Sequence, residues 1–356
     1  MTMESKAEKV LTELVLMRSQ DTDPMGPVAD YVSKHMKRLG MDVRRYGKDD
    51  KPSFVGEHGK GGVILSGHLD TVPIGTGWTK EQGEMVDGVM YGRGTNDMKG
   101  GCAAMLLAAE KLVAAGVPFA LCFTTDEETS MDGAGAASKD PAFLKAPAVV
   151  VTEATEFDIV VREKGLVQFS ITTKGKPAHA SMPHLGENAI AKMVSVLSKL
   201  EDVYRPPKDP LEQMTLCVDT IRGGTAMNVI PDECVAEVDV RYPPHMSTQA
   251  VLELVRRKIG DKGYEVKILH ELDPVGTDQD IEAVKVMKDV VGPKAKVLSV
   301  PYATEMVMFK GVNKKLMVCG PGESAGCHIP DEKIRVADVA KAADIYAEYC
   351  SRMAKG

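Results

Sequence analysis

The sequence has no basic stripe, no long apolar run and no paired-cysteine motif, and each absence excludes a class of protein. The formal net charge is −7, and no segment gathers lysine and arginine along one face, so nucleic acid is not an expected partner. No run approaches the roughly 18 apolar residues of a membrane-spanning helix, and residues 1–9 contain no apolar signal core. We therefore expect no membrane partner.

The seven cysteines are odd in number and form no C-x-x-C pair, so they do not indicate a disulfide framework. Free thiols are typical of a reducing compartment, and we expect a cytoplasmic protein. The sequence also has no internal repeat and no low-complexity stretch. Its 356 residues exceed the usual span of one hydrophobic core, which predicts two domains.

The first part of the chain predicts an α/β sheet. Apolar segments that end just before polar side chains are expected to form buried strands over residues 62–66, 119–125 and 148–152. Helices are expected over residues 4–18, 27–39, 100–115, 281–290 and 336–353, and further strands over residues 43–46 and 315–319. In such sheets, functional sites collect at the carboxyl ends of the strands.

The middle of the chain has a different pattern, in which apolar and polar residues alternate. Strands are expected over residues 166–173, 214–222, 233–241 and 265–269, with helices over residues 188–200 and 248–259. The order strand, helix, strand, strand, helix, strand is that of a ferredoxin-like unit. We expect residues 165–272 to form this inserted domain, and residues 1–164 and 273–356 to form one catalytic domain.

Two candidate site residues have a functional and an ordinary interpretation. His68 follows the predicted strand 62–66, and Asp70 can accept a hydrogen bond from its second ring nitrogen, as metal-binding histidines need. Asp97 lies at a turn that leads into the predicted helix 100–115. The ordinary interpretation of His68 is a structural histidine, and that of Asp97 is a helix cap.

The remaining candidates are mostly acids. Glu127 and Glu128 are neighbours at a strand end, where they repel each other unless a cation binds one, and the free one can take a proton from water. Glu153 has the same topological position, and His328 lies in a Gly-rich loop. The alternatives are solvated loop acids and a structural histidine. Imidazole and carboxylate ligands suit Zn²⁺, and their number indicates two metals that share a carboxylate.

Five short sequence motifs resemble those of a known family. They are Ser-Gly-His-Leu-Asp-Thr-Val-Pro (66–73), Gly-Arg-Gly-Thr-Asn-Asp-Met-Lys-Gly-Gly (92–101), Thr-Asp-Glu-Glu (125–128), Thr-Glu-Ala-Thr (152–155), and Gly-Pro-Gly with His-Ile-Pro-Asp-Glu (320–332). In this order they resemble the co-catalytic zinc aminoacylase and carboxypeptidase family, which includes acetylornithine deacetylase, succinyl-diaminopimelate desuccinylase and bacterial glutamate carboxypeptidase. The resemblance covers nearly the whole chain.

The resemblance implies a zinc-peptidase-like catalytic domain with a mixed sheet, an inserted ferredoxin-like lid and dimerisation domain, and two divalent metal ions. Zinc is the expected metal, with cobalt and manganese as alternatives. The implied metal ligands are His68, Asp97, Glu128, Glu153 and His328, with Asp97 as the bridge. The implied general base is Glu127, and Asp70 is the hydrogen-bonding partner of His68. The resemblance also implies a cis peptide bond between Asp97 and Met98.

In the inserted domain the resemblance implies three further site residues. By position, His179 would reach across a homodimer interface to stabilise the oxyanion of the partner's site. Asn228 and Arg241 would hold the substrate's carboxylate, for which the planar guanidinium of arginine is suited. Each also has the ordinary interpretation of an exposed polar side chain. Cys327 departs from the family, which usually has alanine before this histidine.

These features predict a metal-dependent hydrolase that cleaves an amide bond next to a free carboxylate. The favoured substrate is an N-acyl amino acid, as for acetylornithine deacetylase or succinyl-diaminopimelate desuccinylase. The first alternative is a dipeptidase or a glutamate-type carboxypeptidase acting on a short peptide. The second is a non-catalytic metal-binding protein on the same fold, which predicts a missing ligand or base.

Overall fold

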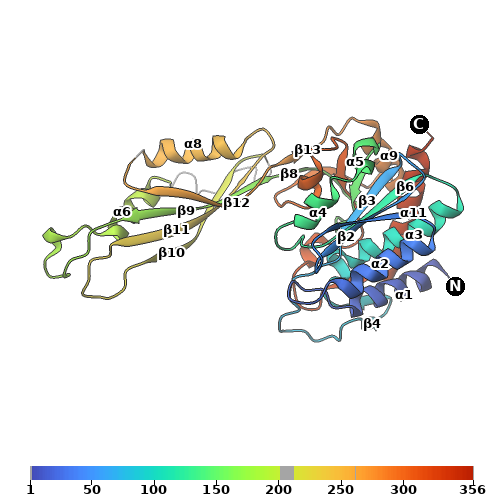
Figure 1. Cartoon of the computed structure of the whole chain (residues 1–356), viewed down its shortest axis with the longest axis horizontal. Coiled ribbons are helices and arrows are strands. Elements are labelled where there is room, and N and C mark those ends of the chain that lie inside the picture. The colour runs from blue at the N-terminus through green and yellow to red at the C-terminus, as the bar shows by residue number, and fades with distance from the viewer. Residues whose placement is uncertain (1, 201–211, 261, 356) are drawn as a thin grey trace. The chain divides into compact units, whose positions relative to one another are not determined.

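The computed structural model describes residues 2–200, 212–260 and 262–355. The chain divides into two compact units, each with its own hydrophobic core. The first unit comprises Met1–Val161, Thr277–Leu298 and Thr304–Gly356. The second comprises Arg162–Gly276 and Ser299–Ala303 (Figure 1).

A mixed β-sheet forms the centre of the first unit. Its neighbouring strands are, in order, β1 (Asp42–Gly47), β2 (Pro52–His58), β6 (Phe119–Thr124), β3 (Val63–His68), β7 (Val149–Val151), β15 (Leu316–Val318) and β8 (Ile159–Glu163). The strands from β6 to β15 are parallel to one another, whereas β1, β2 and β8 are antiparallel to their neighbours. The central strands are buried along their whole length, which explains why they are almost continuously apolar.

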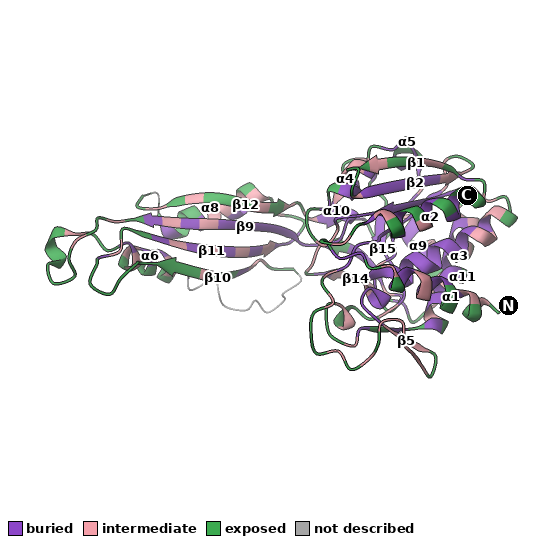
Figure 2. Cartoon of the chain, turned by 60° about the horizontal axis from the view of Figure 1, so that its bottom comes forward, coloured by how far each residue is buried: buried purple, intermediate pink, exposed green. Residues whose placement is uncertain are grey.

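Helices cover this sheet. The helix α3 (Gly100–Ala114) packs against α11 (Val336–Met353) and α1 (Met3–Leu16), while α2 (Gly26–Arg38) lies on β2. Figure 2 shows that α3 is buried along most of its length. Small residues permit this close packing, because a Cβ at Gly101 would lie 2.2 Å from the carbonyl oxygen of Thr152. The helix is thereby held directly beside the end of β7.

The other elements of the first unit are short. The helices are α4 (Asp132–Ala137), α5 (Pro141–Lys145), α9 (Glu282–Val291) and α10 (Met306–Phe309). A small sheet contains β16 (Lys333–Arg335), β5 (Val89–Tyr91) and β4 (Met85–Val86), and β14 (Val297–Val300) pairs with β8. The strand β13 (Val275–Gly276), at the end of the second unit's main segment, also pairs with β8. In the described ranges, no helix combines the length and apolar character that a membrane crossing requires.

The second unit has the predicted ferredoxin-like topology. Its elements along the chain are β9 (Gly165–Lys174), α6 (Ala189–Ser198), β10 (Thr215–Gly223), β11 (Glu233–Tyr242), α8 (Thr248–Ile259) and β12 (Glu265–Leu272). The sheet order is β10-β11-β9-β12, and all neighbours are antiparallel. In Figure 2 the inner strand β11 alternates between buried and less buried residues, whereas the edge strand β10 is largely exposed. The predicted fold class is confirmed.

The strand β2 was not predicted, and its composition explains why. Pro52 begins it and Gly56 lies inside it, and both residues are uncommon in strands. Here the glycine allows α2 to approach the sheet, because a Cβ at Gly56 would lie 2.5 Å from the sulfur of Met36. The strand therefore depends on a tertiary contact that the local sequence does not show.

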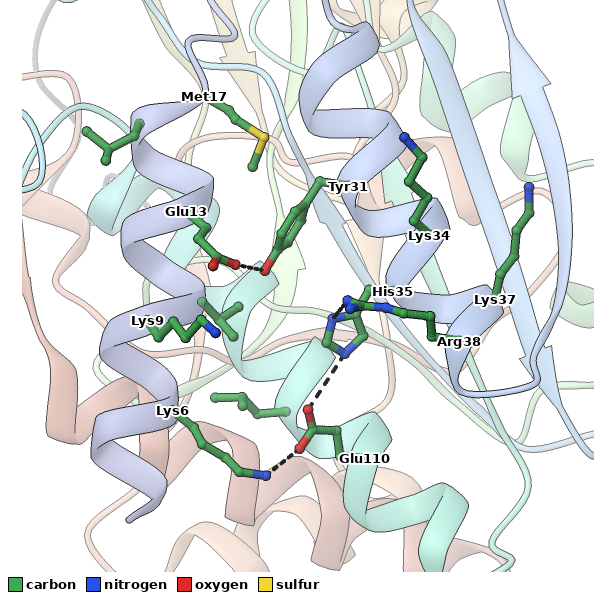
Figure 3. Close-up of a pocket in the computed structure, with 13 residues that line it drawn as sticks. Lys6, Lys9, Glu13, Met17, Tyr31, Lys34, His35, Lys37, Arg38 and Glu110 are labelled. Atoms are coloured by element: carbon green, nitrogen blue, oxygen red, sulfur yellow. Dashed lines mark hydrogen bonds and ion pairs between the residues drawn. The ribbon is translucent and has the colours of Figure 1, made fainter. Parts of the chain in front are cut away.

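A groove of about 1190 Å³ lies between α1 and α2, with α3 beneath it (Figure 3). The Tyr31 hydroxyl donates to the Glu13 carboxylate at 2.6 Å, and Lys6 forms an ion pair with Glu110 at 2.7 Å. None of the candidate site residues lines this groove. The groove is therefore separate from the site described next.

Candidate metal centre

The candidate side chains lie at one edge of the sheet, where the parallel strands end. His68 is the last residue of β3, Glu127 and Glu128 follow β6, and Glu153 follows β7. Asp97 lies in the tight turn Thr95–Lys99 that leads into α3. Because the carboxyl ends of parallel strands meet at one edge, residues far apart in the sequence are brought together.

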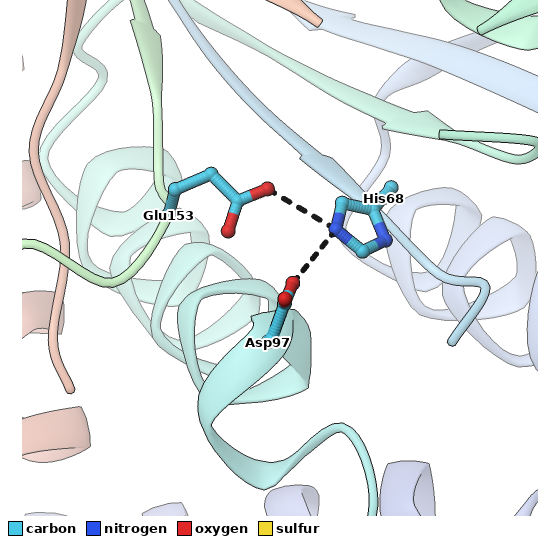
Figure 4. Close-up of side chains that lie close together, drawn as sticks. All are labelled: His68, Asp97 and Glu153. Atoms are coloured by element: carbon cyan, nitrogen blue, oxygen red, sulfur yellow. Dashed lines mark hydrogen bonds and ion pairs between the residues drawn. The ribbon is translucent and has the colours of Figure 1, made fainter. Parts of the chain in front are cut away.

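The first group of possible ligands is His68, Asp97 and Glu153 (Figure 4). The Nε2 atom of His68 lies 3.1 Å from an oxygen of Asp97 and 3.1 Å from an oxygen of Glu153. The Nδ1 atom donates to the backbone carbonyl of Asp70 at 2.9 Å, which leaves Nε2 directed at the two carboxylates.

The second group is Asp97, Glu128 and His328. The Nε2 atom of His328 lies 3.0 Å from Oδ2 of Asp97 and 3.2 Å from Glu128. His328 has a positive φ of 62°, a backbone conformation that is uncommon for residues other than glycine. Asp97 therefore belongs to both groups, with one oxygen facing each histidine.

The electrostatics of these groups fit bound cations. Burial and the charge of Asp97 raise the pKa of Glu153 to about 7. Hydrogen bonds that the His328 ring donates to the carboxylates of Asp97 and Glu128 raise the pKa of His328 to about 10. Burial alone would lower the pKa of His68, but the charges and hydrogen bonds of Glu153 and Asp97 raise it well above its ordinary value. The surrounding carboxylates thus favour positive charge at both imidazoles, and the donor set matches that of divalent metals.

Glu127 lies among the same carboxylates but belongs to neither group. Burial, together with the charges of Glu153, Glu128 and Asp97, raises its pKa well above the ordinary value, although His68 opposes this shift. The residue as a whole is only partly buried, although its carboxyl group is shielded enough for burial to be the largest cause of this shift. This is an arrangement in which a carboxylate can exchange a proton with water.

Asp70 contacts the cluster in a different way from the one predicted. Its Oδ1 lies 3.7 Å from Nδ1 of His68, farther than its own backbone carbonyl, and this buried oxygen has no hydrogen-bond partner among the described residues. Its Oδ2 accepts from the backbone N–H of Glu128 at 3.0 Å. The carboxylate therefore holds the loop that carries Glu127 and Glu128.

The expected cis peptide bond between Asp97 and Met98 is present, and this expectation is confirmed. Cys327, the departure from the family pattern, accepts a hydrogen bond from the Asn96 side chain at 3.1 Å. It lies beside the cluster without being a member of either group.

The three remaining candidates lie in the second unit. His179 and Asn228 are on adjoining segments, because Ala180 N–H donates to the Asn228 carbonyl at 2.9 Å and His179 pairs with Val229. The His179 ring is exposed and shares a hydrogen bond of 2.7 Å with the Ser181 hydroxyl. Arg241 lies on β11, where its guanidinium donates to both oxygens of Asp239.

Sequence reasoning assigned no role to three buried residues near the cluster. The Glu305 carboxylate accepts hydrogen bonds from the hydroxyls of Ser66 and Thr124, beneath the end of β3. Arg93 and Glu332 form a buried ion pair of 2.5 Å next to Asp97. Arg93 and Glu332 both lie within the five motifs that resemble the family. In the sequence alone they look like ordinary surface charges, and only their contacts distinguish them.

A mixed sheet whose strand ends carry two groups of metal-binding side chains is the architecture of a metallohydrolase. The family model described as Peptidase family M20/M25/M40 matches residues 64–352. The chain belongs to this family, and it is a hydrolase.

Named relatives agree with this assignment. The chain is 27% identical to a probable succinyl-diaminopimelate desuccinylase from Staphylococcus epidermidis, over 98% of each chain. It is 28% identical to an acetylornithine deacetylase from Myxococcus xanthus, over 97% of each chain. The solved structure of an M20 family metallo-carboxypeptidase from Sulfolobus solfataricus has the same fold, with a TM-score of 0.80 and 20% identity over 98% of this chain and 99% of that one.

Proposed function

We propose that this protein is a two-metal amidohydrolase that releases an amino acid from an N-acyl amino acid. The observation that carries the proposal is the position of Asp97, whose two carboxylate oxygens face His68 and His328 separately. A bridging carboxylate of this kind suits a pair of cations close together. The names of the deacetylase and desuccinylase relatives support the substrate class.

The proposed ligands are His68, Asp97 and Glu153 for one ion, and Asp97, Glu128 and His328 for the other. Zinc is the proposed metal because the set combines imidazole with carboxylate ligands, and cobalt or manganese suits the same set. Bound cations would supply Lewis-acid chemistry by polarising the amide carbonyl and making water more acidic.

Glu127 is proposed to move the proton. Its carboxylate lies beside both ligand groups without joining either, so it can take a proton from the attacking water. The same carboxyl group then gives the proton to the nitrogen of the departing amine. Asp70 assists by holding the Glu127–Glu128 loop through the backbone N–H of Glu128.

The inserted domain, predicted at residues 165–272, is proposed to bind substrate and to form a homodimer. Arg241 would bind the substrate's carboxylate with Asn228, and this requires the guanidinium to share or exchange its bond with Asp239. The partner subunit's His179 would stabilise the oxyanion. Seven free thiols support the proposal that the enzyme works in a reducing cytoplasm.

Cleavage of short peptides is the second candidate function. The same metal groups serve either reaction, and the structurally similar metallo-carboxypeptidase favours this alternative. The non-catalytic alternative predicts a missing ligand or base, and the proximity of the five proposed ligands and Glu127 supports the catalytic proposal instead.

The test is metal analysis together with hydrolysis assays on N-acetylornithine, N-succinyl-diaminopimelate and simple dipeptides. We expect two divalent ions per chain and turnover of an N-acyl amino acid that stops when the metal is removed. Turnover of dipeptides alone would move the assignment to the peptidase alternative. A protein with two bound ions and no activity on any of these amides would refute the proposed reaction.

A further inference from the structure

Glu332 holds the backbone that carries the bridging carboxylate. Its side chain is buried, with a residue exposure of 1%. One oxygen, Oε1, accepts from the backbone N–H of Asn96 at 2.9 Å and from that of Asp97 at 3.1 Å. Two consecutive peptide groups are therefore fixed by a single carboxylate oxygen from a segment about 235 residues away along the chain.

Arg93 completes this arrangement from the other side of Glu332. Its Nη1 donates to Oε2 of Glu332 at 2.5 Å and to the Ile329 carbonyl at 3.4 Å. Its remaining donors reach the carbonyls of Pro73 and Ile74. Arg93 is only 6% exposed, so the pair is shielded from water and its geometry is well defined.

The contacts of this pair are directed toward the second ligand group. Ile329 is the neighbour of His328, and Glu332 follows in the same loop. Asn96 adds a second connection, because its side chain accepts from the backbone N–H of Glu323 at 2.9 Å and donates to Cys327 at 3.1 Å. The segment of Asp97 and the loop of His328 are thus joined by buried polar contacts.

The first ligand group is positioned mainly by other means. His68 is the last residue of β3, which pairs with β6 and β7 on either side. Glu153 follows β7, whose pairing with β3 sets its place. Only Asp97 in this group depends on Glu332, whereas in the second group both Asp97 and His328 lie on segments that the Arg93–Glu332 pair holds.

We infer that the Arg93–Glu332 ion pair is a positioning device for the second cation site, and that it sets the affinity of that site more than the affinity of the first. The inference rests on the proposed two-metal function. Residues that orient metal ligands typically change affinity by about 10–100-fold when they are mutated. We expect a loss of this size at the second site of Glu332→Gln, and a change of less than about threefold at the first.

The experiment is a cobalt titration of the metal-free full-length chain without substrate, read by metal content after equilibrium dialysis and by the visible absorption of bound Co²⁺. The variants are Glu332→Gln and Arg93→Lys, which keep side-chain size or charge. The control is Asp140→Asn, because Asp140 is also a buried carboxylate that binds an arginine, Arg44, and a backbone N–H. Thermal unfolding of each metal-free protein reports whether it is folded.

The expected result is two ions on the wild type and on Asp140→Asn, and one tightly bound ion with a weakened second on both test variants. The absorption of the first ion should remain, and kcat should fall more than KM rises. Equal weakening of both sites, or the same loss in Asp140→Asn, would overturn the inference. If Glu332→Gln does not fold, Arg93→Lys decides the question. A wild type that binds fewer than two ions would instead contradict the proposed function.

Discussion

The substitution Glu127→Gln separates proton transfer from metal binding. Glutamine has the same shape as glutamate, but it cannot accept a proton from water. Since general bases typically contribute 10²–10⁴-fold, we expect kcat to fall by that factor, or roughly 3–5 kcal/mol in activation free energy. Glu127 belongs to neither ligand group, so the metal content should remain that of the wild type.

In the metal-free protein, the same substitution should weaken the pH dependence of the free energy of unfolding. Burial and the charges of Glu153, Glu128 and Asp97 raise the pKa of Glu127 in the folded state. An acid whose folded pKa is raised stabilises the fold below its ordinary pKa, and this contribution is lost as the pH rises. The metal-free wild type should therefore lose more stability than Glu127→Gln does as the pH rises above about 4.5.

The assay is urea unfolding of both proteins in the presence of a chelator, at several pH values, combined with kinetics and metal analysis of the loaded enzymes. Activity above one tenth of the wild-type value would show that the base is another residue. A loss of bound metal would show that Glu127 is a ligand. An identical pH dependence of unfolding would refute the electrostatic argument.

Three other changes have defined outcomes. Mixing His179→Ala with Glu127→Gln should restore activity that each variant lacks alone, because one mixed site then has both residues; unrestored activity would argue against action across a dimer. When the free metal concentration is 100 times the Kd of a site, removal of the metal should lower the free energy of unfolding by about 2.7 kcal/mol. Urea titration with and without a chelator measures this difference. Asp140→Asn should lower the free energy of unfolding by about 2 kcal/mol. This is less than the loss from breaking a fully buried ion pair, because Arg44 keeps its contact with Glu57. Burial alone would raise the pKa of Asp140, but hydrogen bonds to it, the largest of them donated by Arg44, lower this pKa. The stabilisation by Asp140 should therefore disappear in the wild type as the pH falls below about 3.8, and the variant should show no such loss.

The strand-end residues of the cluster were accessible to sequence reasoning because their positions follow from simple rules. An apolar run of strand length that ends at His68 or Glu153 predicts both the strand and the edge of the sheet where the side chain lies. The resemblance added the bridging role of Asp97 and the cis bond, which local patterns do not indicate. The ferredoxin-like unit was predicted for a similar reason, since its strands alternate in polarity along their length.

Other features depend on contacts that no local pattern encodes. The role of Glu332 depends on the backbone of Asn96 and Asp97, to which it is close only in the folded chain. The Asp70 carboxylate binds a backbone N–H instead of the neighbouring imidazole, a choice set by the fold of the Glu127–Glu128 loop. The strand β2 is similarly determined by the helix that packs on it.

The place of β15 in the sheet has a consequence for synthesis of the chain. This strand comes from residues 316–318 but lies between β7 and β8, which are adjacent in the sequence. While the ribosome is still producing the residues that precede β15, the position between β7 and β8 is unoccupied, and the loop with His328 does not yet exist. A nascent chain can therefore complete its ferredoxin-like domain early, but the cluster of candidate ligands can assemble only after the segment with β15 and His328 has been released.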